Sequence, residues 1–125
     1  MARTLPPTAV LDALAGLPVG RGLTLDLDYV GQFVGRVLWL GVTPTAALLD
    51  HHREVHDRLD AAGVQGWDLY RPGRWVPHCT ISMRVPNPQM AHAIRRCLEM
   101  LPVRATVVGA SVTDHANGIA EPLPS

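Results

Sequence analysis

"WVPHCTISMRV", residues 75–85, is the stretch of sequence that decides the fold. Apolar and polar residues alternate along it, and successive side chains of a β-strand point to opposite faces of a sheet. The pattern predicts a strand with one apolar face, on which we expect Cys79 and Ile81 to be buried. The opposite face carries a polar row and is expected to line a groove. This row consists of His78, Thr80, Ser82 and Arg84.

The rest of the chain predicts an α+β fold in a single domain over residues 1–125. Helices are expected over residues 8–15, 43–62 and 87–101, and strands over residues 23–28, 35–42 and 103–112. The strand over 35–42 is almost continuously apolar and is therefore expected to be central in the sheet. Residues 115–125 are expected to form a loose tail. Helices combined with mostly antiparallel strands are typical of the α+β class.

Composition excludes several classes of protein. The 125 residues include 11 basic and 11 acidic side chains, so the chain lacks the positive surplus that non-specific nucleic-acid binding requires. There is neither an apolar run of membrane-spanning length nor an apolar signal-peptide core near Met1, and a cytoplasmic location is expected. The two cysteines, Cys79 and Cys97, form no disulfide framework or zinc motif, and both are interpreted as small buried hydrophobes.

His78 and Thr80 are the strongest candidates for chemistry. An imidazole can give or take a proton near neutral pH, and a hydroxyl two residues further along a strand lies about 7 Å away on the same face. Such a pair suits an anionic group such as a phosphodiester, with the hydroxyl holding an oxygen and the imidazole transferring a proton. A solvent-facing strand without function is the alternative that these two residues alone leave open.

A longer stretch, "LYRPGRWVPHCTISMRV", resembles the second signature of the 2H phosphoesterases, the superfamily of the 2′-5′ RNA ligases and cyclic phosphodiesterases. "GQFVGRVLWLGVTPTAALLDHHREVHDRL" is similar to the segment that precedes this signature in bacterial members, and the similarity extends over residues 11–114. The residues that carry the signature are Tyr70, Pro72, Trp75, Pro77, His78 and Thr80. The resemblance implies a pseudo-twofold, two-lobed fold with mostly antiparallel sheets. Each lobe contributes one His-x-Thr or His-x-Ser strand.

The resemblance also implies a reaction. One histidine acts as general base and the other as general acid on a 2′,3′-cyclic phosphate or a 2′-5′ linkage of a nucleotide or RNA end, while the hydroxyls bind the phosphate. No metal or other cofactor is required. His78 and Thr80 would be the catalytic residues of this chain. Four neighbours are candidates for substrate binding: Tyr70, Arg71, Arg74 and Trp75.

The chain departs from the family pattern because only His78 is followed two positions later by Thr or Ser. An internal echo, helix then Leu-Pro-Val then strand, occurs at residues 11–28 and 94–112, and it places a counterpart of the His78 strand just upstream of Met1. We therefore expect an N-terminally truncated domain that lacks its first strand or strands, with impaired catalysis and a sheet edge open to self-association. The alternative is a catalytically silent remnant that binds a nucleotide or a protein partner.

His52 and His56 have the i, i+4 spacing of a helical metal pair. Arg53 stands where the zincin motif requires Glu, and His52 falls within the apolar stripe of its helix. These histidines are therefore interpreted as packing residues, and no metal site is predicted. Arg71 and Arg74 flank the turn at Pro72, where a solvated turn is the alternative to phosphate binding. For Trp75 and Tyr70, core packing and contact with a base are both possible interpretations.

Overall fold

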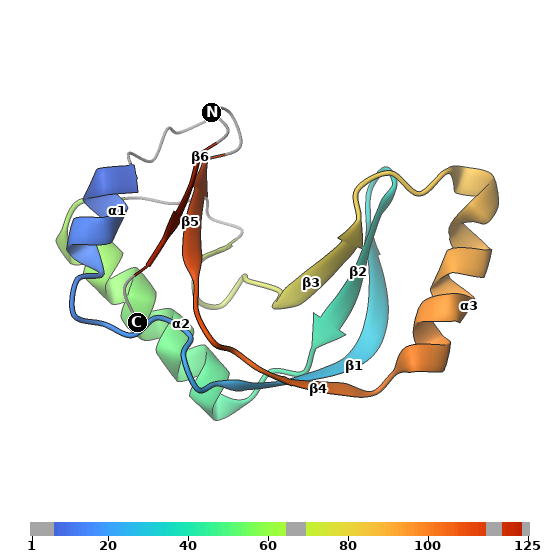
Figure 1. The fold of residues 1–125 in the computed structure, drawn as a ribbon, viewed down its shortest axis with the longest axis horizontal. Helices are drawn as coiled ribbons and strands as arrows, with labels where there is room; N and C mark the ends of the chain where they lie inside the picture. Colours follow the sequence, from blue (N-terminus) through green and yellow to red (C-terminus); the bar gives the residue numbers. More distant parts are fainter. Residues whose placement is uncertain (1–6, 65–69, 115–118, 124–125) are drawn as a thin grey trace. The chain divides into compact units, whose positions relative to one another are not determined.

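The computed structural model describes residues 7–64, 70–114 and 119–123, which form two compact units (Figure 1). Unit 1 draws on Met1–Leu23, Thr45–Trp75 and Thr106–Ser125. Unit 2 draws on Thr24–Pro44 and Val76–Ala105. Helices and antiparallel strands together give the predicted α+β class. No helix among the described residues is long and apolar enough to cross a membrane.

Unit 2 contains a four-stranded sheet in the order β3-β2-β1-β4. Its strands are β1 (Thr24–Phe33), β2 (Val37–Val42), β3 (His78–Ser82) and β4 (Val103–Thr106). The prediction of a central apolar strand is confirmed, since β2 lies between β1 and β3 and pairs antiparallel with both. β3 is an edge strand, so only one side of its backbone is paired within this sheet.

One face of this sheet packs against the helix α3 (Met90–Met100), which follows the short 3-10 turn η2 (Asn87–Gln89) and contacts β1 (Figure 1). Leu38 and Leu40 of β2 are almost completely buried, as are Met90 and Cys97 of α3. Alternation along β2 puts Leu38 and Leu40 on the same face. We call this the α3 face, because Leu38 and Leu40 are buried on it and α3 packs against the same sheet through β1. The prediction that Cys97 is buried is confirmed.

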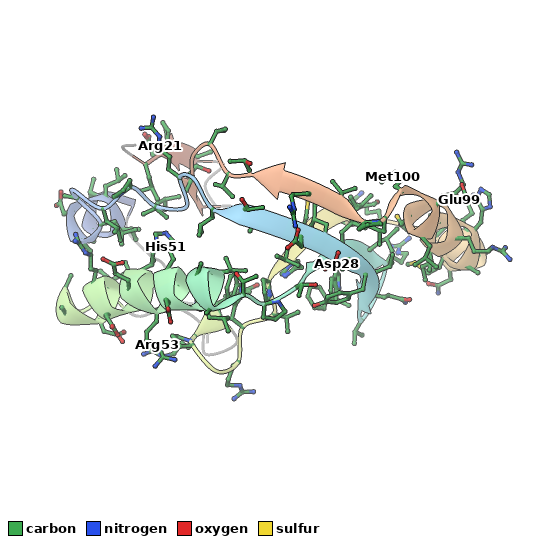
Figure 2. The ribbon with its side chains drawn as sticks, turned by 90° about the horizontal axis from the view of Figure 1, so that it is seen from below. Arg21, Asp28, His51, Arg53, Glu99 and Met100 are labelled. Carbon is green, nitrogen blue, oxygen red and sulfur yellow. The ribbon has the colours of Figure 1, made fainter. Side chains whose placement is uncertain are left out.

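A β-bulge in β1 decides which residues reach the opposite face. Leu27 pairs with Val42, but the register shifts so that Tyr29 pairs with Gly41. Asp28 is the extra residue, and its carboxylate accepts a hydrogen bond from the Thr43 hydroxyl (Figure 2 labels Asp28). A bulge of one residue moves all later side chains to the other face of the sheet. In the second half of β1, the side chains on each face are therefore the opposite set from the one that the alternation of residues 23–28 predicts.

Unit 1 is built from two helices and a hairpin. α1 (Pro7–Ala13), α2 (Ala46–Ala61), β5 (Ser111–Asp114) and β6 (Ile119–Pro122) are its elements, and β5 and β6 pair antiparallel. α2 begins at the N-cap Thr45, whose side chain accepts a hydrogen bond from the Leu48 amide at 3.2 Å. Gly63 follows the helix with φ of 74°, a conformation that favours glycine at a helix end. The core of unit 1 gathers Val10, Leu14, Leu17 and Val64.

Three predicted elements differ in extent. The first strand continues five residues beyond Asp28 because the bulge lets it keep pairing with β2. The predicted final strand over 103–112 is divided between β4 and β5, with a break around Gly109. The prediction of a loose tail is wrong for Ile119–Pro122, which pair with β5, and Leu123 packs against the core of unit 1. Residues 115–118 and 124–125 lie outside the described residues.

The predicted apolar face of the 75–85 strand is wrong in two respects. The strand is shorter, since β3 covers only His78–Ser82, and a bulge after Thr80 interrupts its alternation. Cys79 is exposed rather than buried, and Ile81 is 47% exposed. Cys79 pairs with Leu40 and so points to the α3 face, but it does so from the edge strand, whereas α3 contacts the sheet mainly through β1.

Candidate active site

His78 and Thr80 lie on the same face of the unit 2 sheet, as the alternation predicts. His78 pairs with Gly41 and Thr80 pairs with Trp39, and directly opposed residues of an antiparallel pair share a face. We call this the His78 face. It is the face opposite α3, since Trp39 alternates with Leu38 and Leu40 along β2. His78 is half-buried and Thr80 is exposed, so both side chains have access to solvent.

The imidazole of His78 is oriented by the backbone that precedes it. Its Nδ1 atom lies 2.7 Å from the carbonyl oxygen of Val76. A carbonyl oxygen can only accept a hydrogen bond, so Nδ1 must carry the hydrogen. In the neutral ring the lone pair is then on Nε2, which is the nitrogen left to take up a proton. The local chain thus fixes both the ring orientation and the tautomer that a general base needs.

Aromatic rings surround His78 on this face. The Phe33 ring lies edge-to-face against the imidazole, with centroids 4.9 Å apart and planes at 89°. The Trp39 ring lies 5.6 Å from the imidazole and 5.0 Å from Phe33. Tyr29 extends the cluster, with its ring 6.0 Å from that of Trp39. Edge-to-face and tilted contacts at these distances are favourable, so the cluster helps to hold the imidazole in place.

Two glycines make room for these rings. A Cβ atom on Gly31 would lie 2.1 Å from the Trp39 ring, and one on Gly41 would lie 2.0 Å from the Tyr29 ring. The rings therefore occupy the space of the missing side chains. Trp39 is 8% exposed, and its indole nitrogen is buried with no hydrogen-bond partner among the described residues. An unpaired buried donor costs about 1–3 kcal/mol, which the packing of the cluster must offset.

The expected polar row ends at Thr80. After the bulge in β3, Ser82 pairs with Leu38, whose side chain is on the α3 face. The Ser82 hydroxyl accepts a hydrogen bond from the Arg84 amide at 3.2 Å, and Arg84 lies beyond the end of the strand. The prediction that Ser82 and Arg84 continue the row of His78 is therefore wrong, because a one-residue bulge reverses the face.

The four predicted substrate-binding residues lie in unit 1, on the segment between α2 and β3. Arg71 forms a two-point ion pair with Asp60 of α2, at 2.7 and 3.0 Å. The hydrogen bonding from Arg71 holds the pKa of the Asp60 carboxyl below its usual value. Arg74 and Tyr70 are exposed. Their contact with a substrate stays a prediction, as do those of Arg71 and Trp75.

Trp75 stacks on His52 of α2, with ring centroids 3.9 Å apart and planes at 11°. His56 lies 4.4 Å from His52. Burial, and then the neighbouring His56, lower the pKa of His52 from 6.5 to about 4. Burial, followed by the charge of Arg71, also lowers the pKa of His56. Both rings are therefore neutral at pH 7, as the interpretation as packing residues requires.

The neighbouring histidine has a different role. The ring of His51, on the same helix, accepts a hydrogen bond from the Gly20 amide at 2.7 Å, while Figure 2 shows Arg53 on the other side of α2.

No group of three or more His, Cys, Asp and Glu side chains close enough to hold a metal ion occurs within the part of the chain that the structure describes.

A comparison with protein families gives a match over most of the chain. The family model described as the 2′-5′ RNA ligase superfamily matches residues 8–119. The chain belongs to the 2′-5′ RNA ligase superfamily. The resemblance inferred from the residues around His78 is thereby confirmed at the level of the family. No curated protein and no solved structure matches the chain.

The aromatic cluster of this superfamily member was not predicted. Tyr29, Gly31 and Phe33 recur at a spacing of two, which is the signal of a strand with one aromatic face. That signal is short, and without the bulge at Asp28 these residues would share the face of Leu25 and Leu27. The sequence pattern alone therefore gives no indication that they lie beside His78.

Proposed function

We propose that this chain acts on a phosphodiester of a nucleotide or RNA end, either a 2′,3′-cyclic phosphate or a 2′-5′ linkage, with His78 as an acid–base residue. The observation that carries the proposal is the hydrogen bond between Nδ1 of His78 and the carbonyl of Val76. It leaves Nε2 as the proton acceptor on a face that also carries the Thr80 hydroxyl. The family assignment supports a substrate of this class.

In the proposed hydrolysis, a water oxygen attacks the phosphorus of the cyclic diester. Nε2 of His78 removes a proton from that water, and the bond from phosphorus to one ribose oxygen breaks. The ribose oxygen leaves as a hydroxyl after it receives a proton from a general acid. The Thr80 hydroxyl donates a hydrogen bond to a non-bridging phosphoryl oxygen, where negative charge accumulates in the transition state.

The general acid of this scheme stays a prediction. In the family it is a histidine on a second His-x-Thr or His-x-Ser strand. The five other histidines of this chain are followed two positions later by Arg, Glu, Arg, Ile and Asn. This observation favours a second candidate function, in which the chain binds a nucleotide or a protein partner without turnover. The expected exposed sheet edge and self-association also stay predictions.

The test compares four proteins: wild type, His78→Ala, Thr80→Ala and His92→Ala. His92 is the matched control because it is an exposed histidine of the same unit, on α3. Loss of a general base typically lowers the rate by about 10²–10⁴-fold. We expect this loss in His78→Ala, a smaller loss in Thr80→Ala and none in His92→Ala with 2′,3′-cyclic nucleotides and a 2′-5′-linked dinucleotide. Binding of a nucleoside monophosphate by wild type without any turnover would favour the second candidate.

A further inference from the structure

Two aromatic side chains on the His78 face are open to solvent. Tyr29 is 38% exposed and Phe33 is 39% exposed, although both belong to the sheet of unit 2. Both lie on the face of His78, because Tyr29 pairs with Gly41, which in turn pairs with His78, and Phe33 follows Tyr29 by four residues along β1. The described chain thus exposes aromatic surface beside the residues proposed to bind a phosphodiester.

Structural features of the unit 2 sheet determine the position of these rings. The bulge at Asp28 turns Tyr29 and Phe33 away from the α3 face. Gly41 leaves the space in which the Tyr29 ring lies, next to the strand that carries His78. Phe33 reaches the imidazole itself, at a centroid distance of 4.9 Å. The two rings therefore approach His78 from one strand, β1, while Thr80 lies on another, β3.

We propose that Tyr29 and Phe33 form a stacking surface for the nucleobase adjacent to the phosphodiester. The inference rests on the proposed function of His78 and Thr80, and it assigns the residues that would contact the base of that substrate. A base is attached to the same ribose as a 2′,3′-cyclic phosphate, so a phosphate held at Thr80 keeps its base close to the His78 face, where the Tyr29 ring lies over Gly41 of β2 and the Phe33 ring lies beside His78. An exposed aromatic ring offers such a base about 1–3 kcal/mol of stacking free energy.

Charge supports the same ligand. The chain carries equal numbers of acidic and basic residues, so a positive surplus over the whole chain does not supply the affinity for a nucleotide. The cluster of Tyr29, Phe33 and Trp39 contains no ionised side chain. Stacking is tolerant of base identity because every base has a π-face. The surface is therefore expected to favour nucleotides over phosphodiesters that lack a base, and to discriminate weakly among the four bases.

The experiment measures selectivity for the base. It divides kcat/KM for each 2′,3′-cyclic nucleotide by kcat/KM for ribose 2′,3′-cyclic phosphate, which has the same reacting group but no base. Tyr29→Leu is the decisive variant, because the Tyr29 ring lies over Gly41, whereas the Phe33 ring packs against the imidazole itself. We expect this ratio to fall by about 5–150-fold for all four bases, the range that corresponds to the stacking free energy. Phe33→Leu should lower it as well.

Controls separate stacking from general damage. Tyr29→Phe keeps the ring and should keep the ratio. Leu98→Ala removes an exposed apolar side chain of α3, 53% exposed, and should leave the ratio unchanged. Melting temperatures identify any variant that fails to fold. An unchanged ratio in Tyr29→Leu overturns the stacking surface, and so does an equal loss for substrates with and without a base.

Failure of the proposed function has a different signature, which is the absence of turnover with either substrate in the wild type. In that case calorimetric titration decides the inference without catalysis. The titrants are adenosine 2′-monophosphate and ribose 2-phosphate, each with wild type and Tyr29→Leu. Tighter binding of the nucleotide by wild type, lost in Tyr29→Leu, supports the stacking surface. Equal affinities for the two titrants contradict it.

Discussion

His78 and Val76 are joined by a hydrogen bond between a side chain and a backbone carbonyl two residues away, with Nδ1 and the oxygen 2.7 Å apart. The contact is local, so it depends on the backbone around Pro77 rather than on distant packing. Pro77 itself is buried, and the Val42 amide donates a hydrogen bond to its carbonyl at 3.1 Å. The backbone that sets the tautomer of His78 is therefore held in place by its hydrogen bond to β2.

The first prediction concerns that tautomer. In nitrogen-detected NMR spectra at a pH at which His78 is neutral, Nδ1 should be the protonated nitrogen and Nε2 the unprotonated one. His92, which is exposed on α3, serves as the internal reference for a ring in solvent. A neutral His78 with its hydrogen on Nε2 contradicts the assignment of Nε2 as the proton acceptor.

The second prediction tests the space that glycine leaves for the aromatic cluster. Gly31→Ala puts a Cβ 2.1 Å from the buried Trp39 ring, so the ring or the strand must shift. Overpacking of this kind typically costs about 1–3 kcal/mol. Gly109→Ala is the matched control, because a Cβ there meets nothing within 4 Å. Thermal unfolding should show a lower melting temperature for Gly31→Ala alone, and equal melting of both variants contradicts the packing of Trp39 over Gly31.

The third prediction is a pH dependence of stability that arises from His52. Its pKa is about 4 in the folded chain and 6.5 in the unfolded chain, because burial and then His56 disfavour the charged ring. Between these values the unfolded state binds a proton that the folded state does not. The free energy of unfolding therefore rises with pH through this window, and stability is lost as the pH falls below 6.5. The partial exposure of the ring limits the loss between pH 7 and pH 5 to about 1 kcal/mol.

His52→Phe separates this effect from general acid sensitivity. Phenylalanine keeps a ring that can stack on Trp75 but cannot take up a proton. The drop in melting temperature between pH 7 and pH 5 should be smaller in His52→Phe than in wild type, by about 5 °C for a domain of this size. His92→Phe should retain the wild-type drop. An identical drop in all three proteins shows that His52 does not control the stability at acidic pH.

Much of the fold follows from local signals. The apolar run over 35–42 identified the central strand, and the helix expected over 43–62 corresponds to α2. The position of His78 and Thr80 on the same face of the sheet followed from the two-residue period of a strand. Each of these signals depends only on the neighbours of a residue along the chain. The strand β6 could not be predicted from local signals, because it is stabilised by its pairing with β5 and by the packing of Leu123 on the core of unit 1.

The features that the sequence did not predict arise from bulges and from sheet order. A bulge changes the face of every later residue but has no distinct sequence signal here. The one at Asp28 brought Tyr29 and Phe33 to the His78 face, and the one after Thr80 removed Ser82 from it. The exposure of Cys79 follows from the edge position of β3, which is a property of the whole sheet. Periodicity alone cannot distinguish an edge strand from a central one.

The central claim is that His78 transfers a proton in the cleavage of a phosphodiester. The most direct test follows adenosine 2′,3′-cyclic phosphate by phosphorus NMR in the presence of wild type, His78→Ala or His92→Ala. We expect wild type and His92→Ala to convert the cyclic diester to a single monoester at a rate about 10²–10⁴-fold above that of His78→Ala. Conversion at the same rate by His78→Ala, or none by wild type, contradicts this claim.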